Sequence, residues 1–544
     1  MHRLSALDGI GSHTLKPMKS RWIGLGVILA IVGGFLAIRG AKQRPNQPFQ
    51  TSFWFWQSPY ELTRSDLKSL KEIGVKQMFV RAGTFSSDGT NIILMFPQKY
   101  ADGSDALPVH LVFNADAGVL RHFEDYKLST IVPQISERIA LQLKAARGRG
   151  VRVIGVQLDF DVPTRLLPRY ADLIKGIRAS SSQFAKQKGF QFSMTGLMSW
   201  LGTNGLEKVS DEVDFIVPQA YEGITGKTPD EMRPVFDPDD LKQRLPKAEQ
   251  LNCPYWIGIP AYGHAIIYDE LGRLRGTYRN LEAQDALRHP SFRLLEAYPS
   301  DKKGRPAQNE NDWVGEEILK FRAIKPSPSG QGLGYTIAFS LPTPKLLEKA
   351  FDEVKQNRGP NCQGVIIYRM PEPGSSFTIP FESSPLIKHK KDVAPNLEVK
   401  VIGNIDAYEA VEQTLNSIPI DLYVEVKNIG NDGTFVAPDA IDIKIELDKP
   451  GITSVRLRDF DSIAFAVTSS KQEVLTSARN ANVFHLKKGF LAAGEKCFAG
   501  PIRLLNSGDL HVKIKWRIRT SSGFSWLEHE TPESLLKNDA RGQH

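Results

Sequence analysis

Three polar side chains stand at two-residue steps at the end of an otherwise apolar stretch, residues 151–161 (VRVIGVQLDFD). In an extended strand alternate residues face the same side, so Gln157, Asp159 and Asp161 share one face. Two neighbouring carboxyl groups repel each other when both are ionised, and this repulsion raises the pKa of one of them. A solvated strand end before Pro163 is the simpler alternative. A strand this apolar seldom carries two inward aspartates without a role, so we favour a functional carboxyl pair.

Polar and aromatic residues also end several of the other apolar stretches. Carboxylates and amides bind sugar hydroxyls, and aromatic rings stack on the C–H faces of a pyranose, so this pattern indicates a carbohydrate site. Taken singly, Trp54 and Trp56 are more readily explained as core residues, and His264 as the start of an insertion. The candidate substrate-binding residues are Gln157, Trp200, Gln219, Tyr221, Tyr262, His264, Glu372, Trp54 and Trp56, and the candidate catalytic residues are Asp159, Asp161 and Glu222.

Eight strand-like runs alternate with amphipathic segments between residues 51 and 380. Continuous apolar strands that alternate with helices are typical of a parallel sheet covered by helices. Eight such units predict an α/β fold, a (β/α)₈ TIM barrel, with a doubly wound sheet as the alternative. In the barrel, the C-terminal ends of the strands carry the functional side chains. The runs are 51–56, 76–82, 109–114, 151–161, 190–200, 213–221, 255–262 and 364–370, and the helical segments are 62–74, 135–150, 166–189 and 344–356.

Two connections depart from this alternation. Residues 84–108 are expected to form a long irregular loop. Residues 264–334 separate the seventh strand from its helix, and they contain a strand pair that turns at Leu271-Gly272 and a helical stretch near 315–323. A connection this long inside a compact barrel is typical of a small inserted subdomain that borders the site.

The pattern changes again after residue 395. Residues 421–430, 440–448 and 509–520 alternate apolar and polar side chains with a period of two, and turn-forming clusters separate them. This pattern predicts an antiparallel, immunoglobulin-like β-sandwich over residues 395–530, after a barrel domain over residues 46–390. The polar residues 531–544 are expected to be a disordered tail. In one interpretation, the β-sandwich binds a protein partner.

The net charge of +8 is concentrated near the N-terminus, because residues 1–50 carry +6 and the remaining 494 residues only +2. A nearly neutral body does not favour a nucleic-acid partner. Residues 22–38 contain no charged side chain and would span roughly 26 Å as a helix, which suits a single-pass membrane anchor within residues 1–45. A cleaved signal is the rival interpretation, but Arg39 follows the apolar run directly. The flanking charges favour a cytoplasmic N-terminus, and hence a body outside the cytoplasm.

Several kinds of site are not supported by the sequence. Cys253, Cys362 and Cys497 are widely separated and form no CxxC pair, which argues against a zinc ribbon or a disulfide framework. The 11 histidines form no HxxxH or HxH cluster, and no glycine-rich phosphate loop follows a strand. We therefore predict neither a metal nor a cofactor.

Four motifs together resemble a known enzyme family. GVQLDFD, DFIVPQAYE, WIGIPAYGH and GVIIYRM are similar, in order, to the fourth, sixth, seventh and eighth strands of chitinase-type glycoside hydrolases, over residues 51–380. The anchor, the segment LDFDVPTRLLPRYADLIKGIR and the trailing β-domain more closely resemble a family of uncharacterised bacterial proteins, which is defined only by a domain of unknown function with a hydrolase-like barrel. The resemblance implies a polysaccharide or oligosaccharide partner, with Asp161 holding an acetamido group and Tyr221 and Glu222 matching a tyrosine–acid pair.

One position departs from the chitinase motif, in which a glutamate general acid stands two residues after the second aspartate. Pro163 occupies that position here. A hydrolase with a relocated acid, which would use Asp159 or Asp161 with Glu222, is one hypothesis. A non-catalytic glycan-binding or envelope-assembly barrel is the second, and a structural barrel that acts through the β-sandwich is the third. We prefer the enzyme, because both inward aspartates are retained at a cost in stability.

Overall fold

The computed structural model of the chain describes residues 48–88, 91–101, 106–180, 189–221, 226–278, 281–326, 332–373, 375–387, 394–405, 418–469, 472–506, 510–520, 523–532 and 534–536. No helix in this described part is long and apolar enough to cross a membrane. The predicted anchor, residues 22–38, lies outside the described residues, and so does Glu222.

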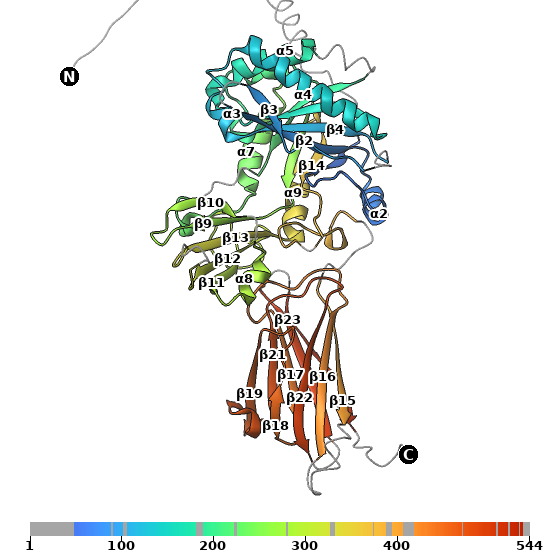
Figure 1. The fold of residues 1–544 in the computed structure, drawn as a ribbon, viewed down its shortest axis with the longest axis vertical. Helices are drawn as coiled ribbons and strands as arrows, with labels where there is room; N and C mark the ends of the chain where they lie inside the picture. The colour runs from blue at the N-terminus through green and yellow to red at the C-terminus, as the bar shows by residue number, and fades with distance from the viewer. Residues whose placement is uncertain are drawn as a thin grey trace, which may run out of the picture. The chain divides into compact units, whose positions relative to one another are not determined.

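Eight parallel strands form a closed barrel, which is the fold that the sequence predicted (Figure 1). The strands pair in the order β1-β14-β8-β7-β6-β5-β4-β2, and β1 also pairs with β2. This last pairing joins Phe53 to Met78 and Phe55 to Val80, and it leaves no open edge between the first and second barrel strands. A closed sheet rules out the doubly wound alternative, whose sheet is open.

The barrel elements agree closely with the predicted runs. All eight predicted strands and all four predicted helical segments are present. The strands are β1 (Gln50–Phe55), β2 (Met78–Ser87), β4 (Val109–Ala115), β5 (Val153–Asp159), β6 (Gln191–Leu197), β7 (Phe215–Gln219), β8 (Tyr255–Pro260) and β14 (Cys362–Tyr368). The helices between them include α2 (Arg64–Ile73), α3 (Ala117–Arg121), α4 (Leu128–Gly148), α5 (Leu167–Ser180), α6 (Leu206–Ser210), α7 (Pro238–Ala248) and α9 (Pro344–Asn357).

Helix α2 begins and ends at residues that satisfy its terminal backbone groups. Thr63 caps α2 through a hydrogen bond from the Asp66 backbone N–H, and the Asp66 carboxylate accepts the Thr63 N–H in return. Gly74 ends the same helix in a left-handed conformation with a φ of 87°. These two caps fix the residues at which α2 starts and stops.

The interior of the barrel is filled by large aromatic side chains. Phe79 stacks on His110, with ring centroids 4.6 Å apart, and also contacts Phe215 and Trp256. Above them, a Cβ atom at Gly258 would lie 3.0 Å from the Trp54 ring and 3.1 Å from that of Tyr221. The absent side chain of this glycine therefore makes room for two aromatic rings at the end of the barrel that carries the candidate site.

Two sequence predictions about the connections are wrong. Residues 84–108 are not irregular throughout, because β2 continues to Ser87 and forms an antiparallel hairpin with β3 (Ile92–Met95). The stretch near 315–323 is not a helix but the strand β12 (Glu316–Ala323). The strand lies between β13 and β11, and all its residues except Arg322 are buried. Because both faces of the strand are covered, its apolar residues do not follow a single helical stripe.

The insertion after β8 is a five-stranded sheet with one short helix packed against it. The strands pair in the antiparallel order β10-β9-β13-β12-β11, and β13 (Thr336–Pro342) lies beyond the predicted end at residue 334. Ala283 and Ala286 of α8 lie in the core of this subdomain. The remaining elements are β9 (His264–Tyr268), β10 (Leu274–Tyr278), α8 (Ala283–Arg288) and β11 (Phe292–Pro299).

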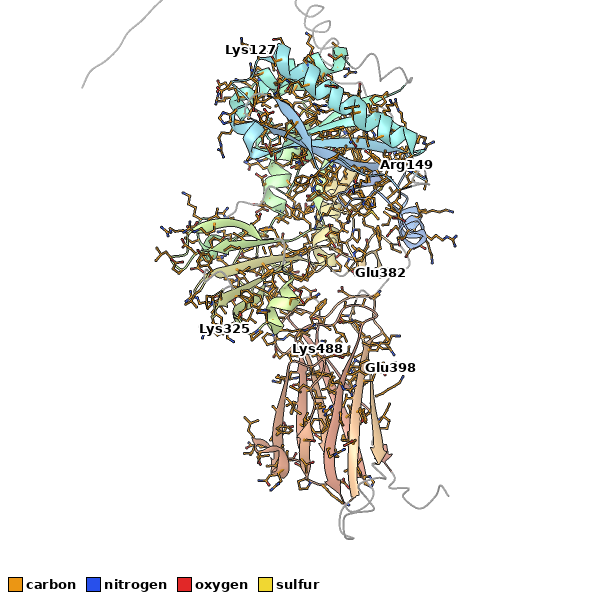
Figure 2. The ribbon with its side chains drawn as sticks, viewed as in Figure 1. Lys127, Arg149, Lys325, Glu382, Glu398 and Lys488 are labelled. Atoms are coloured by element: carbon orange, nitrogen blue, oxygen red, sulfur yellow. The ribbon has the colours of Figure 1, made fainter. Side chains whose placement is uncertain are left out.

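The C-terminal part consists of two antiparallel sheets around a core of their own, as predicted for a β-sandwich. One sheet has the order β15-β16-β22-β18, and the other has β20-β19-β21-β17-β23-β24 with β25 beside β23. Figure 2 labels Glu398 on β15 and Lys488 on β21. The strands are β15 (Leu397–Ile405), β16 (Ile418–Asn428), β17 (Ile441–Leu447), β18 (Ile452–Val455), β19 (Ser462–Ser469), β20 (Gln472–Leu475), β21 (Val483–Lys488), β22 (Lys496–Asn506), β23 (Leu510–Arg519), β24 (Trp526–Glu530) and β25 (Ser534–Leu536).

Candidate functional site

Gln157 and Asp159, the two predicted ladder residues that lie on β5, point into the barrel as the alternation predicted, whereas Asp161 lies beyond the end of the strand and is exposed. Gln157 is fully buried, and its Oε1 accepts a hydrogen bond of 2.9 Å from the Trp54 indole N–H across the barrel. The Gln157 amide lies 3.4 Å from the Ser193 hydroxyl on β6. Gln157 thus links β1, β5 and β6 below the carboxyl groups.

Asp159 is the last residue of β5 and is tied to the next two strands. Its Oδ1 accepts hydrogen bonds from the Thr195 hydroxyl (2.6 Å) and from the Gln219 amide (3.0 Å). Burial raises the pKa of Asp159, and the two hydrogen bonds act against that rise. Because both donors bind Oδ1, Oδ2 is the oxygen on which a proton is best placed.

Asp161 lies two residues after the end of β5. Its side chain is exposed, whereas that of Asp159 is only partly exposed. Burial raises the pKa of Tyr221 well above its ordinary value, and the charges of Asp159 and Asp161 raise it further. Pro163, in the position of the chitinase acid, has a φ of −56° at the start of a 3₁₀ turn.

Aromatic side chains from four strand ends gather beside the two carboxyl groups. The Tyr221 ring stacks on Tyr368 with centroids 5.4 Å apart, and Tyr262 meets both rings edge-on, at 5.7 and 4.8 Å. Trp54 lies 6.3 Å from Tyr221, and Trp56 lies 5.3 Å from Tyr368. We call these five residues the aromatic cluster. Trp54 is 1% exposed and forms its base, whereas Trp56, Tyr262 and Tyr368 keep part of their surface accessible.

Three other predicted residues lie outside the aromatic cluster. Trp200 is 1% exposed and packs against Tyr170, 6.4 Å away, so its position is that of a core residue. His264 begins β9 in the insertion, where burial lowers its pKa to about 4. Glu372 forms an ion pair of 3.1 Å with Arg369, directly after the β14 residue Tyr368.

Sequence reasoning missed two residues that complete the site. Thr195 donates the shorter of the two hydrogen bonds to Asp159. Its inward direction could have been predicted, because alternate residues of β6 face the barrel interior. Tyr368 stacks on Tyr221. It is the last residue of β14, and the C-terminal ends of barrel strands are where functional side chains are expected. Within the described residues, no group of His, Cys, Asp or Glu side chains is arranged to hold a metal ion.

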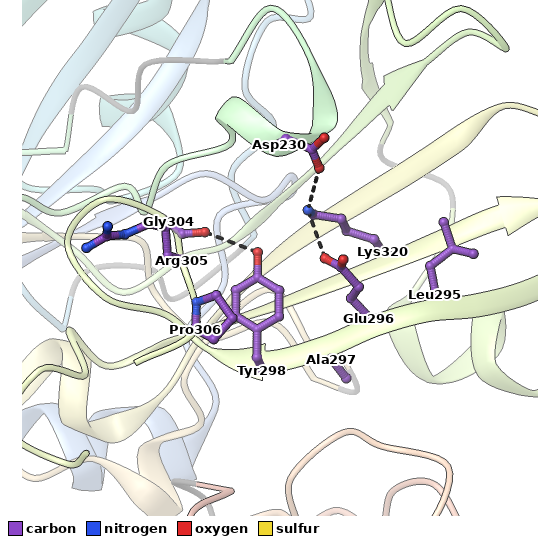
Figure 3. A pocket seen from close by; sticks show the side chains of 9 residues that line it. All are labelled: Asp230, Leu295, Glu296, Ala297, Tyr298, Gly304, Arg305, Pro306 and Lys320. Carbon is purple, nitrogen blue, oxygen red and sulfur yellow. Dashed lines mark hydrogen bonds and ion pairs between the residues drawn. The ribbon is translucent and has the colours of Figure 1, made fainter. Parts of the chain in front are cut away.

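Two cavities lie near these elements. One, of about 1020 Å³, is lined by residues that follow β1 and β14, including Gln57 and Glu372, and by residues of the insertion and the β-sandwich. The other, of about 590 Å³, lies on the insertion, where Lys320 forms ion pairs with Asp230 and Glu296 beside Tyr298 (Figure 3). Among the predicted site residues that the structure describes, Glu372 alone lines either of them.

Residues 126–293 match the model of a family described as "Domain of unknown function (DUF3142)". This match confirms the resemblance to a family that is defined only by such a domain. It covers β5, β6, β7 and β8, and hence Asp159, Asp161 and Tyr221. Among curated proteins, no sequence matches the chain.

Solved structures similar to the chain include chitinases and related proteins. The spore cortex-lytic enzyme SleL of Bacillus cereus is 13% identical, with 62% of this chain and 76% of that chain covered and a TM-score of 0.37. Chitinase ChiA74 of Bacillus thuringiensis is 9% identical, with 85% and 98% covered and a TM-score of 0.36. The chitinase-like agglutinin of Robinia pseudoacacia is 12% identical, with 59% and 92% covered and a TM-score of 0.33.

Proposed function

We propose that the barrel binds a polysaccharide across the aromatic cluster and hydrolyses it with the carboxyl groups of Asp159 and Asp161. The observation that carries this proposal is that the Asp159 carboxyl group is hydrogen-bonded to Gln219 at the end of β7, two residues before Tyr221, whose ring stacks on the partly accessible Tyr368. Aromatic rings bind the C–H faces of sugars, and the hydrolysis of a glycosidic bond needs carboxyl groups that exchange protons.

The two aspartates suit different parts of this chemistry. Asp161 is exposed at the mouth of the barrel, so its carboxyl group is the one that can reach the glycosidic oxygen or an acetamido group. Asp159 lies deeper, and its raised pKa favours the protonated carboxyl group that a general acid needs. We propose Glu222, which follows Tyr221 in the sequence, as the carboxyl group that acts with these aspartates from the other side of the scissile bond.

A glycan-binding barrel without turnover is the second candidate, and Pro163 is the observation that favours it. The pyrrolidine ring cannot donate a proton, so the acid of the chitinase motif is absent at its usual position. In this version Asp161 and the aromatic cluster bind the sugar, and no bond is broken.

One experiment separates the two candidates. The purified full-length chain is incubated with polymers of N-acetylglucosamine, of glucosamine and of glucose, and with bacterial envelope polysaccharide, and new reducing ends are measured alongside binding. Hydrolysis predicts product that falls at least 100-fold in Asp161→Asn and in Asp159→Asn, since general acid–base catalysis contributes roughly 10²–10⁴-fold. Glu222→Gln tests the proposed second carboxyl group. Binding without product favours the receptor, and neither binding nor product would reject both versions.

We also propose that residues 22–38 anchor the protein in a membrane, with the barrel on the extracytoplasmic side. The proposal rests on the uncharged stretch between Arg21 and Arg39 and on the basic residues before it. Extraction of membranes with alkaline carbonate should leave the full chain in the pellet, and protease added outside intact cells or spheroplasts should reach the barrel. Release of the chain by carbonate would contradict the anchor.

A further inference from the structure

The side chain of Phe96 is exposed to solvent at the end of the hairpin formed by β2 and β3. Phe96 directly follows β3, is 69% exposed and has a φ of 49°. Left-handed backbone is unfavourable for a bulky side chain, and an exposed aromatic ring adds nothing to the core. Both features lower the stability of the fold, so they point to a use for the ring in binding.

The hairpin that carries Phe96 is fixed at both of its ends. Near Phe96, the Gln98 backbone N–H donates to the Ala82 carbonyl (2.9 Å), and the Gln98 amide donates to the Gln57 carbonyl (2.7 Å). At the other end of β3, the Ile92 N–H donates to the Gln134 side chain of α4 (2.7 Å). The exposed ring is therefore presented on a rigid support, which lowers the entropy cost of binding.

Arg81 connects this ring to the aromatic cluster. Its guanidinium lies 5.9 Å from the centre of the Phe96 ring and 5.9 Å from that of Trp56. Hydrogen bonds to Thr84 (2.7 Å) and Asn114 (3.4 Å) hold it in place. Because Trp56 contacts Tyr368 of the cluster, Phe96, Arg81, Trp56 and Tyr368 form one connected row, which we call the rim track.

We propose that Phe96 is a distal sugar-binding subsite and that the rim track selects a long glycan chain over a short one. This inference rests on the proposed function, because it assumes that the aromatic cluster binds sugar. The ring of Phe96 stacks on a pyranose beyond the unit bound at Trp56, and the charged Arg81 side chain lies beneath the part of the glycan between these two rings. A chain too short to reach Phe96 gains nothing from it.

The test compares a short oligosaccharide with a long one. Dimers and hexamers of N-acetylglucosamine, glucosamine and glucose are titrated calorimetrically into the full-length chain and its variants. We expect the hexamer of the sugar that binds to be favoured over its dimer. Phe96→Ala should lower the ratio of hexamer to dimer affinity about three- to tenfold, as expected for one aromatic contact. Phe96→Trp should preserve the ratio.

Two further variants separate binding from folding. Phe96→Asn places a residue that tolerates positive φ at this position, so the ratio should fall while the melting temperature does not. Phe498→Ala removes another exposed phenylalanine, 37% exposed on β22, and should leave the ratio unchanged. An unchanged ratio in Phe96→Ala, or equal losses for dimer and hexamer, would overturn the distal subsite alone. If no sugar binds the wild-type chain, the proposed function fails and the subsite fails with it.

Discussion

At the scale of single residues, Asp159 is the most constrained group in the candidate site. Its burial favours the neutral carboxyl, whereas the Thr195 hydroxyl and the Gln219 amide stabilise the ionised form. Since burial dominates, the pKa of Asp159 is raised, and its ionisation at neutral pH lowers the stability of the folded chain. A core residue selected for stability alone would not carry this carboxyl group.

Replacement of Asp159 by Asn should therefore stabilise the fold while it abolishes hydrolysis. The amide oxygen still accepts from Thr195 and Gln219, and no charge is left to desolvate. A raised folded-state pKa gives stability at low pH that is lost as the pH rises, so the advantage of Asp159→Asn should grow as the pH rises above about 3.9, the ordinary pKa of an aspartate. Thermal unfolding of both proteins across this range measures it. A constant or reversed difference in melting temperature would contradict the raised pKa of Asp159.

The alternation of β5 was sufficient to predict the direction of Gln157 and Asp159, because a strand has a fixed period of two. It was not sufficient for Trp200, which follows β6 and turns into the core beside Tyr170. The alternation of side chains predicts their direction only for residues within the strand. The same limit hid Phe96, since nothing in the sequence shows that the residues around it form a hairpin.

At the scale of elements, one buried glutamate connects the insertion to the connection between β7 and α7. Glu316 opens β12, and its carboxylate accepts the backbone N–H groups of Val235 (3.1 Å) and Phe236 (3.2 Å). The Ser340 hydroxyl of β13 also donates to it. Burial raises the pKa of Glu316 to about 7, although these hydrogen bonds act in the opposite direction. Glu316 is thus a buried link between the insertion and the connection that follows Tyr221, beside the ion pair of Lys320 with Asp230.

Glu316→Gln should make the stability of the protein less sensitive to pH. In the unfolded chain a glutamate titrates at about 4.3, and in the folded chain Glu316 titrates at about 7. Its contribution to stability is present below the unfolded pKa and is lost as the pH rises through 7, whereas Gln does not titrate. The decrease in melting temperature from pH 5 to pH 8 should be smaller in Glu316→Gln. Glu398→Gln, on the exposed surface of β15, is the control and should follow the wild type.

At the scale of the whole molecule, the barrel and the β-sandwich have separate hydrophobic cores. The barrel core includes Ile257 of β8, and the sandwich core includes Ile443 of β17, each fully buried. No residue belongs to both of these cores. Domains with separate cores can unfold in separate transitions.

Calorimetry should accordingly show two unfolding transitions that respond to different substitutions. Ile443→Ala should lower the melting temperature of the β-sandwich transition only, and Ile257→Ala that of the barrel transition only. Each substitution should lower the free energy of unfolding of its own domain by about 2–5 kcal/mol. Glycan binding should raise the barrel transition alone, because a ligand stabilises the domain that binds it. A single transition lowered by both substitutions would show instead that the two cores unfold together.

The order of the eight barrel strands, four of the helices that alternate with them and the inward face of β5 could be predicted from the sequence alone. These features depend on local periodicity and on the apolar character of short segments, which a single chain segment carries on its own. Only the tertiary structure decided that β1 pairs with β2, that Thr195 and Gln219 meet Asp159, and that Arg81 lies between Phe96 and Trp56. These are contacts between segments distant in sequence or across strand ends, and their geometry follows from closing the sheet rather than from any local pattern.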